Sequence, residues 1–253
     1  MTITRKNRDT PSGTQAVVRA LKLLKTINRS ADPISLDELA SVHGLSKSTA
    51  YRMLSALTTE RMAKQDPETR LFSPGPESFA AGVQSVAQFD IRSVARPILT
   101  KMSALAGETA TLEIRIENEM LILDEVHGNS LVGARPEIGT RWPMYATSSG
   151  KAVLASLPDS ELHTYLALPR ERLTEKTVVD DQKLRRQLKK GLIDRFWLSI
   201  EELQPAFSAV STVISDHNGV ILGTVSIGGL ANRLSRNRLS ELGVLLVAEV
   251  HRL

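Results

Sequence analysis

Two short segments combine residue types that can bind a ligand. The first, Ser46 to Arg52, places hydroxyl, lysine, tyrosine and arginine side chains at the start of a predicted helix. The first turn of a helix in the DNA major groove contacts base edges, and the residues beside it hold phosphates. We therefore predict DNA contacts from Ser46, Lys47, Ser48, Thr49, Tyr51 and Arg52. The alternative is that Ser46 only caps the helix, Thr49 packs and the cations are solvated.

The second segment, Thr147 to Lys151, predicts an anion site. Thr147 or Ser148 should cap a helix that begins near Ser149, and the free amides and dipole of a helix start attract an anion. Gly150 would allow a ligand to approach the backbone closely. A carboxylate ligand could then bind between walls formed by Trp142, Met144, Tyr145 and Ser226. A helix start whose cap is satisfied internally is the alternative.

Other chemistries find no support in the sequence. Lys151 lacks the glycine six residues before it and the hydroxyl after it that a phosphate-binding loop requires. The chain has no cysteine, and its five histidines are not spaced as metal ligands. No Ser-His-Asp order stands out, and Glu201-Glu202 is interpreted as a solvated turn pair rather than a catalytic dyad. We expect no metal, no cofactor and no enzymatic activity.

The charge of the chain is unevenly distributed. Residues 1–80 hold 12 basic against 8 acidic side chains, and the rest of the chain holds 20 of each. The whole net charge of +4 therefore lies in the first third, as in a nucleic-acid-binding module. No apolar run approaches the roughly 18 residues of a membrane span. Residues 1–14 lack the apolar core of a signal peptide, so we expect a cytoplasmic protein without a membrane partner.

The elements around the first segment predict a winged helix-turn-helix. Residues 1–13 indicate a flexible basic arm. In residues 14–27, Val17, Leu21, Leu24 and Ile27 recur at helical spacing. "SLDE" at 35–38 is a capping box for a second helix, which Gly44 ends. Ser46 caps a third helix with Ala50, Leu54 and Leu57 inward, and a turn at 66–69 joins two extended pieces. These elements define a DNA-binding domain over residues 14–76.

The rest of the chain predicts an α+β domain. A helical linker at 77–94 leads into a helix at about 91–106. Residues 110–126 and 207–229 alternate as two hairpins, the second around an Asn-Gly turn. Helices are expected at 149–157, 181–190 and 235–252, with Leu184 and Leu188 on the inward face of the second. Two hairpins with helices between them place an α+β domain at 95–253.

Together these segments resemble the isocitrate-lyase-regulator (IclR-type) family of bacterial transcription factors. The resemblance depends on "AVVRALKLLKTI", "SLDELASVHGLSKSTAYRMLSAL" and "DPETRLFSPGP" in the first domain. In the second it depends on "GTRWPMYATSSGKAVLASLP", "EELQPAFSAV" and "GVILGTVSIGG". It implies a winged helix, a linker helix and a GAF-like domain that binds a small organic-acid effector. It also implies a homodimer or homotetramer on a near-palindromic operator of double-stranded DNA, regulating a catabolic operon.

The sequence departs from the family at three places, one of which is Ser211-Thr212-Val213-Ile214, where many members have Ala-Ala-Pro-Val. Arg70 and Leu71 follow the wing turn where relatives usually have Gly and then Arg; Arg70 is retained as a DNA-binding candidate. Ser199 and Ala209 fall where some relatives have an Asp and a Cys in the effector pocket. The residues expected to bind the effector are Met144, Thr147, Ser149, Gly150, Lys151, Ser199 and Ser226.

Two other functions compete with a ligand-responsive regulator. An enzyme acting on a small acid would need a nucleophile with its base, or a metal, and neither is found. A ligand-independent architectural DNA-binding protein would use its second domain only to oligomerise. The effector, the operator and the choice between repression and activation stay open.

Overall fold

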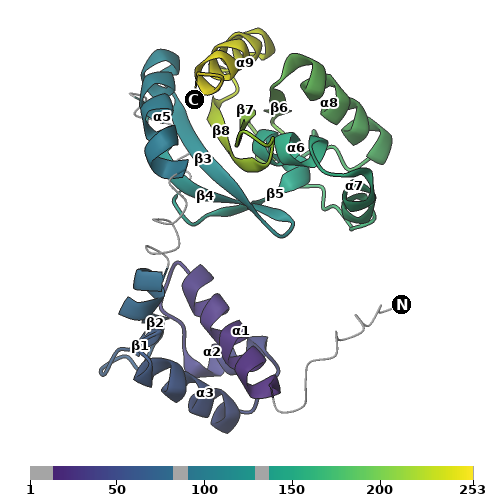
Figure 1. Cartoon of the computed structure of the whole chain (residues 1–253). Coiled ribbons are helices and arrows are strands. Elements are labelled where there is room, and N and C mark those ends of the chain that lie inside the picture. Colours follow the sequence, from purple (N-terminus) through teal and green to yellow (C-terminus); the bar gives the residue numbers. More distant parts are fainter. Residues whose placement is uncertain (1–13, 82–90, 129–136, 253) are drawn as a thin grey trace. The chain divides into compact units, whose positions relative to one another are not determined.

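The chain divides into two compact units, Met1–Phe89 and Asp90–Leu253 (Figure 1). The computed structural model describes residues 14–81, 91–128 and 137–252. The predicted arm, 1–13, and residues 82–90 of the predicted linker lie outside this range, so both stay predictions. None of the helices within the described residues is long and apolar enough to cross a bilayer.

Residues 14–74 of the first unit form three helices and a two-stranded antiparallel sheet, as predicted, and a further helical segment follows at 76–81. The three helices and the two strands are α1 (Gln15–Arg29), α2 (Leu36–Val42), α3 (Lys47–Thr59), β1 (Ala63–Gln65) and β2 (Phe72–Pro74). Ser35 Oγ accepts the amide of Glu38 at 3.2 Å, and Ser46 Oγ accepts that of Thr49 at 3.2 Å. Gly44 joins the two helices at φ +60°, a conformation that glycine adopts without a steric penalty. Local capping therefore fixes where α2 ends and α3 begins.

The core of the first unit confirms the predicted inward face of α3. Ala50, Leu54 and Leu57 are buried there. The face of α1 differs from the expectation, since Val17 is 59% and Leu21 is 50% exposed. The first half of α1 therefore presents apolar side chains that the described residues of this unit leave exposed.

The second unit is built on a six-stranded antiparallel sheet of order β5-β4-β3-β8-β7-β6. The predicted hairpins are β3 (Thr109–Ile116) with β4 (Glu119–Val126), and β7 (Phe207–Ser215) with β8 (Ile221–Leu230). Their turns contain Glu117 at φ +57° and Gly219 at φ +78°. The edge strands β5 (Arg141–Pro143) and β6 (Trp197–Ile200) were not predicted, because three or four residues give too little alternation to detect.

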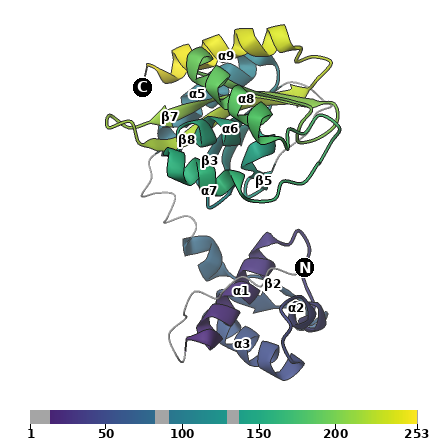
Figure 2. The same cartoon turned by 90° about the vertical axis from the view of Figure 1, so that its right-hand side faces the viewer.

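Helices cover both faces of this sheet (Figure 2). On one face α5 (Ile91–Ala106) lies beside α9 (Arg236–Val250), and on the other α6 (Ser148–Ala155) packs on β7, β6 and β8, with α8 (Asp181–Asp194) against it. All four were predicted, whereas the 3-10 turn η1 (Met144–Ala146) and α7 (Asp159–Leu166) were not. Because side chains alternate along a strand, odd-numbered residues of β3 and even-numbered residues of β8 face α6. The α+β architecture is thereby confirmed.

Candidate functional site

The start of α3 is held by a cluster of hydroxyl groups. Ser46 Oγ lies 2.8 Å from Thr49 Oγ1 and 3.1 Å from Ser48 Oγ, and it also caps the helix. This geometry supports the capping role that was weighed against DNA contact for Ser46. A hydroxyl group has one proton and two acceptor positions, so Ser48 and Thr49 retain capacity for a further partner.

The cationic and aromatic residues of α3 point outward. Tyr51 and Arg52 are exposed, on the side opposite Ala50 and Leu54. Lys47 Nζ lies 2.7 Å from Asp37 Oδ2, but both side chains are more than half exposed. An exposed ion pair contributes little to stability, so a phosphate could displace Asp37. The outward face of α3 is therefore available to DNA, while its contacts stay predictions.

The wing turn is ordered by Asp66. Its Oδ1 accepts the amides of Glu68 at 3.0 Å and Thr69 at 2.8 Å, and the Thr69 hydroxyl as well. These hydrogen bonds, that of the Thr69 amide foremost, lower the pKa of Asp66. Arg70 follows at φ +61°, exposed, in a conformation that favours glycine. A glycine, which the family resemblance leads one to expect at that position, would adopt this conformation without a steric penalty, and a DNA contact of Arg70 stays a prediction.

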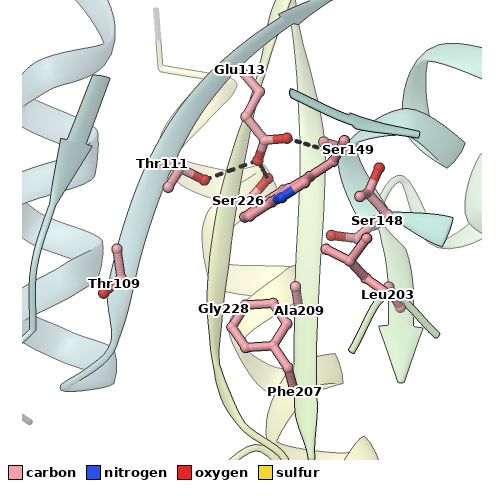
Figure 3. Close-up of a pocket in the computed structure, with 13 residues that line it drawn as sticks. Thr109, Thr111, Glu113, Ser148, Ser149, Leu203, Phe207, Ala209, Ser226 and Gly228 are labelled. Carbon is pink, nitrogen blue, oxygen red and sulfur yellow. Dashed lines mark hydrogen bonds between the residues drawn. The ribbon is translucent and has the colours of Figure 1, made fainter. Parts of the chain in front are cut away.

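A cavity lies between the sheet of the second unit and the start of α6 (Figure 3). Side chains with hydroxyl groups dominate one part of its lining, and apolar side chains form the other. The lining residues are Thr109, Thr111, Glu113, Trp142, Thr147, Ser148, Ser149, Ser199, Leu203, Phe207, Ala209, Ser226 and Gly228. Glu113 is the one acidic or basic residue of this set.

The Glu113 carboxyl group accepts three hydroxyl hydrogen bonds (Figure 3). Its Oε1 accepts from Thr111 at 2.9 Å and from Ser226 at 2.7 Å. Its Oε2 accepts a hydrogen bond from Ser149, at the start of α6. The side chain is buried, and this burial raises the pKa of Glu113, while the three hydrogen bonds act in the opposite direction.

A chain of hydroxyl groups extends from this carboxyl group to α6. Ser226 Oγ lies 2.6 Å from Ser211 Oγ, which lies 2.6 Å from Ser148 Oγ. Since Ser226 donates its single proton to Glu113, Ser211 must donate to Ser226 and Ser148 to Ser211. The state of Glu113 therefore orients hydroxyl groups on two strands and one helix.

The cap of α6 is Thr147, one of the two predicted candidates. Thr147 Oγ1 accepts the amide of Gly150 at 3.0 Å. Gly150 itself has a different role from the one expected, because a Cβ there would lie 2.2 Å from the Cα and carbonyl oxygen of Met144. Gly150 thus allows close packing of α6 on the preceding turn rather than the approach of a ligand.

The structure brings only part of the predicted effector set together. Thr147, Ser149, Ser199 and Ser226 line the cavity, as does the expected wall residue Trp142. Two others do not: Met144 is fully buried in an apolar cluster with Tyr145, and Gly150 packs on Met144.

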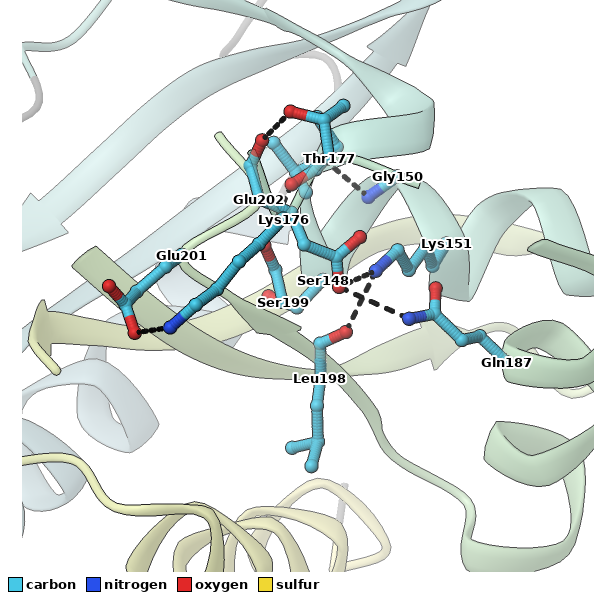
Figure 4. A network of polar contacts seen from close by, with 12 residues as sticks. Ser148, Gly150, Lys151, Lys176, Thr177, Gln187, Leu198, Ser199, Glu201 and Glu202 are labelled. Carbon is cyan, nitrogen blue, oxygen red and sulfur yellow. Dashed lines mark hydrogen bonds and ion pairs between the residues drawn. The ribbon is translucent and has the colours of Figure 1, made fainter. Parts of the chain in front are cut away.

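Lys151 also lies outside this cavity, because it follows Ser149 by two residues and points from the other side of the helix. Its Nζ lies 2.6 Å from Glu202 Oε1 and donates to the carbonyl oxygen of Leu198 at 3.1 Å (Figure 4). Glu202 is 4% exposed, so the interpretation of Glu201-Glu202 as a solvated pair is wrong for Glu202. Glu201 is partly exposed and pairs with Lys176.

Sequence reasoning missed the lining residues of β3. Thr109, Thr111 and Glu113 share one face of that strand, alternating with the buried Ala110 and Leu112. A carboxyl residue between the apolar Leu112 and Ile114 was the available signal. It was not recognised because two of its three hydroxyl partners, Ser226 on β8 and Ser149 on α6, are far away in the sequence.

Comparisons with known proteins agree over nearly the whole chain. Residues 83–252 match the family described as bacterial transcriptional regulator IclR C-terminal, and residues 16–67 match the IclR helix-turn-helix domain. The HTH-type transcriptional repressor AllR of Klebsiella pneumoniae is 27% identical over 235 residues, 92% of this chain and 86% of the relative.

Solved structures show the same architecture. The IclR protein of Thermotoga maritima is 26% identical with a TM-score of 0.70, over 93% of this chain and 95% of the other. An IclR homolog of Microbacterium hydrocarbonoxydans, complexed with 4-hydroxybenzoate, is 19% identical with a TM-score of 0.78. The match covers 94% of this chain and 100% of the other. At that identity the second likeness shows the fold alone.

Proposed function

Because the chain belongs to the IclR family of bacterial transcriptional regulators, we propose that it represses transcription in the cytoplasm by binding an operator through α3. A small organic molecule in the cavity beside Glu113 controls this binding. The family match spans more than half of the chain, and the AllR protein named above is a transcriptional repressor. An activator of the same architecture is the alternative.

The outward face of α3 carries this proposal. Lys47, Ser48, Tyr51 and Arg52 are exposed on a helix whose start is fixed by Ser46 and whose other face is buried. A helix in the major groove needs this division between an anchored face and a reading face. Arg52 can bind guanine with two hydrogen bonds, and Lys47 can bind a phosphate.

The exposed face of α1 supports a homodimer. Val17, Val18 and Leu21 are 59%, 37% and 50% exposed, on adjacent turns of one helix. A second copy of the chain would bury this apolar surface and add a second α3. Two copies related by a two-fold axis would bind two half-sites of a near-palindromic operator. Pairing of two such dimers through the second units would give the tetramer.

The effector half of the proposal is supported by the cavity. Its lining combines seven hydroxyl-bearing residues, one carboxyl group and the apolar side chains of Trp142, Leu203 and Phe207. Such a mixture is typical of small-molecule sites. A protein of the same fold is complexed with 4-hydroxybenzoate. The amides of Ser148 and Ser149, which begin α6 and have no carbonyl partner within the helix, offer hydrogen-bond donors to a molecule bound there.

The test is binding to selected DNA. The full chain is used to select sequences from a random pool, and the selected duplex is compared with a scrambled duplex by fluorescence anisotropy over a range of salt concentrations. We expect preference for the selected duplex and a log–log salt slope of about 0.9 per phosphate contact. Equal affinity for both duplexes at physiological salt would contradict the proposal. An effector that never changes DNA affinity would favour the ligand-independent architectural protein.

A further inference from the structure

We propose that the effector is an uncharged or cationic molecule that donates an N–H or O–H hydrogen bond to Oε2 of Glu113, and that the cavity selects against simple carboxylates. The inference rests on the proposed function, since it specifies the chemistry of the same cavity. It differs from the organic acid that the sequence led us to expect.

The hydrogen bonds of Glu113 leave a position open for a donor. A carboxylate offers about four acceptor positions, two on each oxygen. The hydroxyl groups of Thr111 and Ser226 fill those of Oε1, and that of Ser149 fills one on Oε2. Glu113 is 2% exposed and lines the cavity, so the remaining position on Oε2 is available to a molecule bound there.

Glu113 also lies where a carboxylate ligand was expected. The hydrogen bond from Ser149 holds its Oε2 beside the first turn of α6, the end of the helix that attracts an anion. A carboxyl group of the protein itself thus occupies this helix start. A carboxylate ligand would have to share this place with Glu113.

The lining offers such a ligand no compensating charge. Apart from Glu113, the described residues that line the cavity are hydroxyl-bearing, apolar or glycine, and none is a lysine, arginine or histidine. Two carboxylates in one buried site disfavour each other's ionised form. Burial already raises the pKa of Glu113, and a donor from the ligand would stabilise its ionised form instead.

The apolar part of the lining defines the rest of the ligand. Phe207 and Ala209 on β7 and Leu203 before it are joined by Trp142 on β5. These side chains suit a small hydrocarbon or ring portion next to the donor group. We therefore expect an amphipathic molecule, with its donor toward β3 and its apolar part toward Phe207.

Matched pairs of compounds test the inference. The melting temperature of the full chain is measured at pH 7.5 with benzamide against benzoate, and with lactamide against lactate, each at the same concentration. We expect the amide of at least one pair to raise the melting temperature and its acid not to. Since a ligand at about 100 times its dissociation constant adds about 2.7 kcal/mol, the shift should be several degrees.

Variants assign the preference to this carboxyl group. Glu113→Gln keeps the size of the side chain and removes its charge, so the difference between amide and acid should disappear. Glu113→Ala also removes the carboxyl group. It replaces Glu113→Gln in the comparison if that variant does not unfold in a cooperative transition. Glu125→Gln is the matched control, because Glu125 lies on the neighbouring strand outside the cavity lining. It should keep the wild-type preference.

The outcomes separate the inference from the proposed function. Acids that stabilise the wild-type protein as much as their amides would overturn the inference and leave an acid-responsive regulator. A preference for amides that survives in Glu113→Gln and Glu113→Ala would also overturn it. No stabilisation by any compound, in the wild type or in the variants, would count against the effector half of the proposed function and against the inference together.

Discussion

The ammonium group of Lys151 lies 2.6 Å from Oε1 of Glu202, and both side chains are buried beneath α6. Gln187 Nε2 donates to the same carboxylate oxygen at 3.2 Å, and Thr177 Oγ1 donates to the carbonyl oxygen of Glu202 at 2.8 Å. The pair joins α6, α8 and the turn after β6. Leu203, the next residue of that turn, lines the cavity, so Lys151 positions a cavity wall without contacting the ligand.

Replacing Lys151 with methionine should destabilise the second unit strongly. The change leaves Glu202 buried without an opposite charge, and breaking one partner of a buried ion pair costs about 3 to 5 kcal/mol. Both tryptophans of the chain, Trp142 and Trp197, belong to this unit, so urea unfolding followed by tryptophan fluorescence reports its stability.

The double variant Lys151→Met with Glu202→Leu is the control. Replacing both charges by apolar side chains of similar volume is often nearly neutral. We therefore expect the double variant to recover most of the lost stability. A loss as large as that of the single variant would show that the charge of Glu202 is not the cause.

The buried Glu113 should make stability depend on pH. Its pKa in the folded protein is raised above the ordinary value of 4.5, so the folded state binds the proton more tightly than the unfolded state. The free energy of unfolding should therefore decrease as pH rises from 4.5 through the raised value. Melting temperatures of the wild type and of Glu113→Gln, measured from pH 4.5 to 8, should show the wild type gaining relative stability toward acid. A constant difference would contradict a raised pKa.

Arg52→Ala should abolish preference for the operator and leave folding intact. Arg52 is exposed on α3, and a good arginine–guanine pair supplies about 1 to 3 kcal/mol of discrimination, a factor of about 5 to 150 in affinity. Anisotropy with selected and scrambled duplexes measures the ratio. Lys25→Ala removes an exposed cation from α1 instead. It should lower the affinity for the selected and the scrambled duplex about equally, so that the ratio stays the same. Unchanged preference in Arg52→Ala, with normal melting, would refute the role of this side chain.

Leu21→Glu should separate the homodimer. Leu21 is half exposed in the apolar face of α1, and a buried carboxylate there would have no partner. Light scattering of the protein as it elutes from a size-exclusion column should give a lower molar mass than that of the wild type. The affinity for the near-palindromic duplex should also fall. Lys22→Glu introduces a carboxylate at the adjacent exposed position and is the control. An unchanged molar mass for Leu21→Glu would place the dimer contact elsewhere.

Gly150→Ala should destabilise α6 through overlap with the backbone. The added Cβ would lie 2.2 Å from Met144 Cα, and overpacking of this kind typically costs about 1 to 3 kcal/mol. Tryptophan fluorescence in urea measures the loss. Gly107→Ala, where the methyl group meets no atom within 4 Å and only a φ of +71° opposes it, should cost less. Equal losses would mean that α6 can move away from Met144.

Local chemistry in the sequence determined where most elements begin and turn. Ser35 and Ser46 each accept a hydrogen bond from the amide three residues further along, and Gly219 adopts a positive φ in its turn. Each of these helix starts and turns therefore depends only on residues close by in the chain. The winged helix-turn-helix, both long hairpins and the capped α6 could therefore be predicted. Strands β5 and β6 could not be predicted in this way, because each is stabilised by pairing with a longer strand, β5 with β4 and β6 with β7.

Only the tertiary structure decided what surrounds the cavity. Glu113 meets Ser149 and Ser226 across 36 and 113 residues of chain, and Lys151 meets Glu202 across 51. From the sequence we assigned "TSSGK" a single role at an anion site, yet Ser149 and Lys151 point to opposite sides of α6. Which side faces a ligand depends on how the helix packs on the sheet. Helical periodicity places Ser149 and Lys151 on different sides of α6. Only the packing of α6 against β3 and β6 decides that Ser149 faces the cavity and that Lys151 forms the buried ion pair.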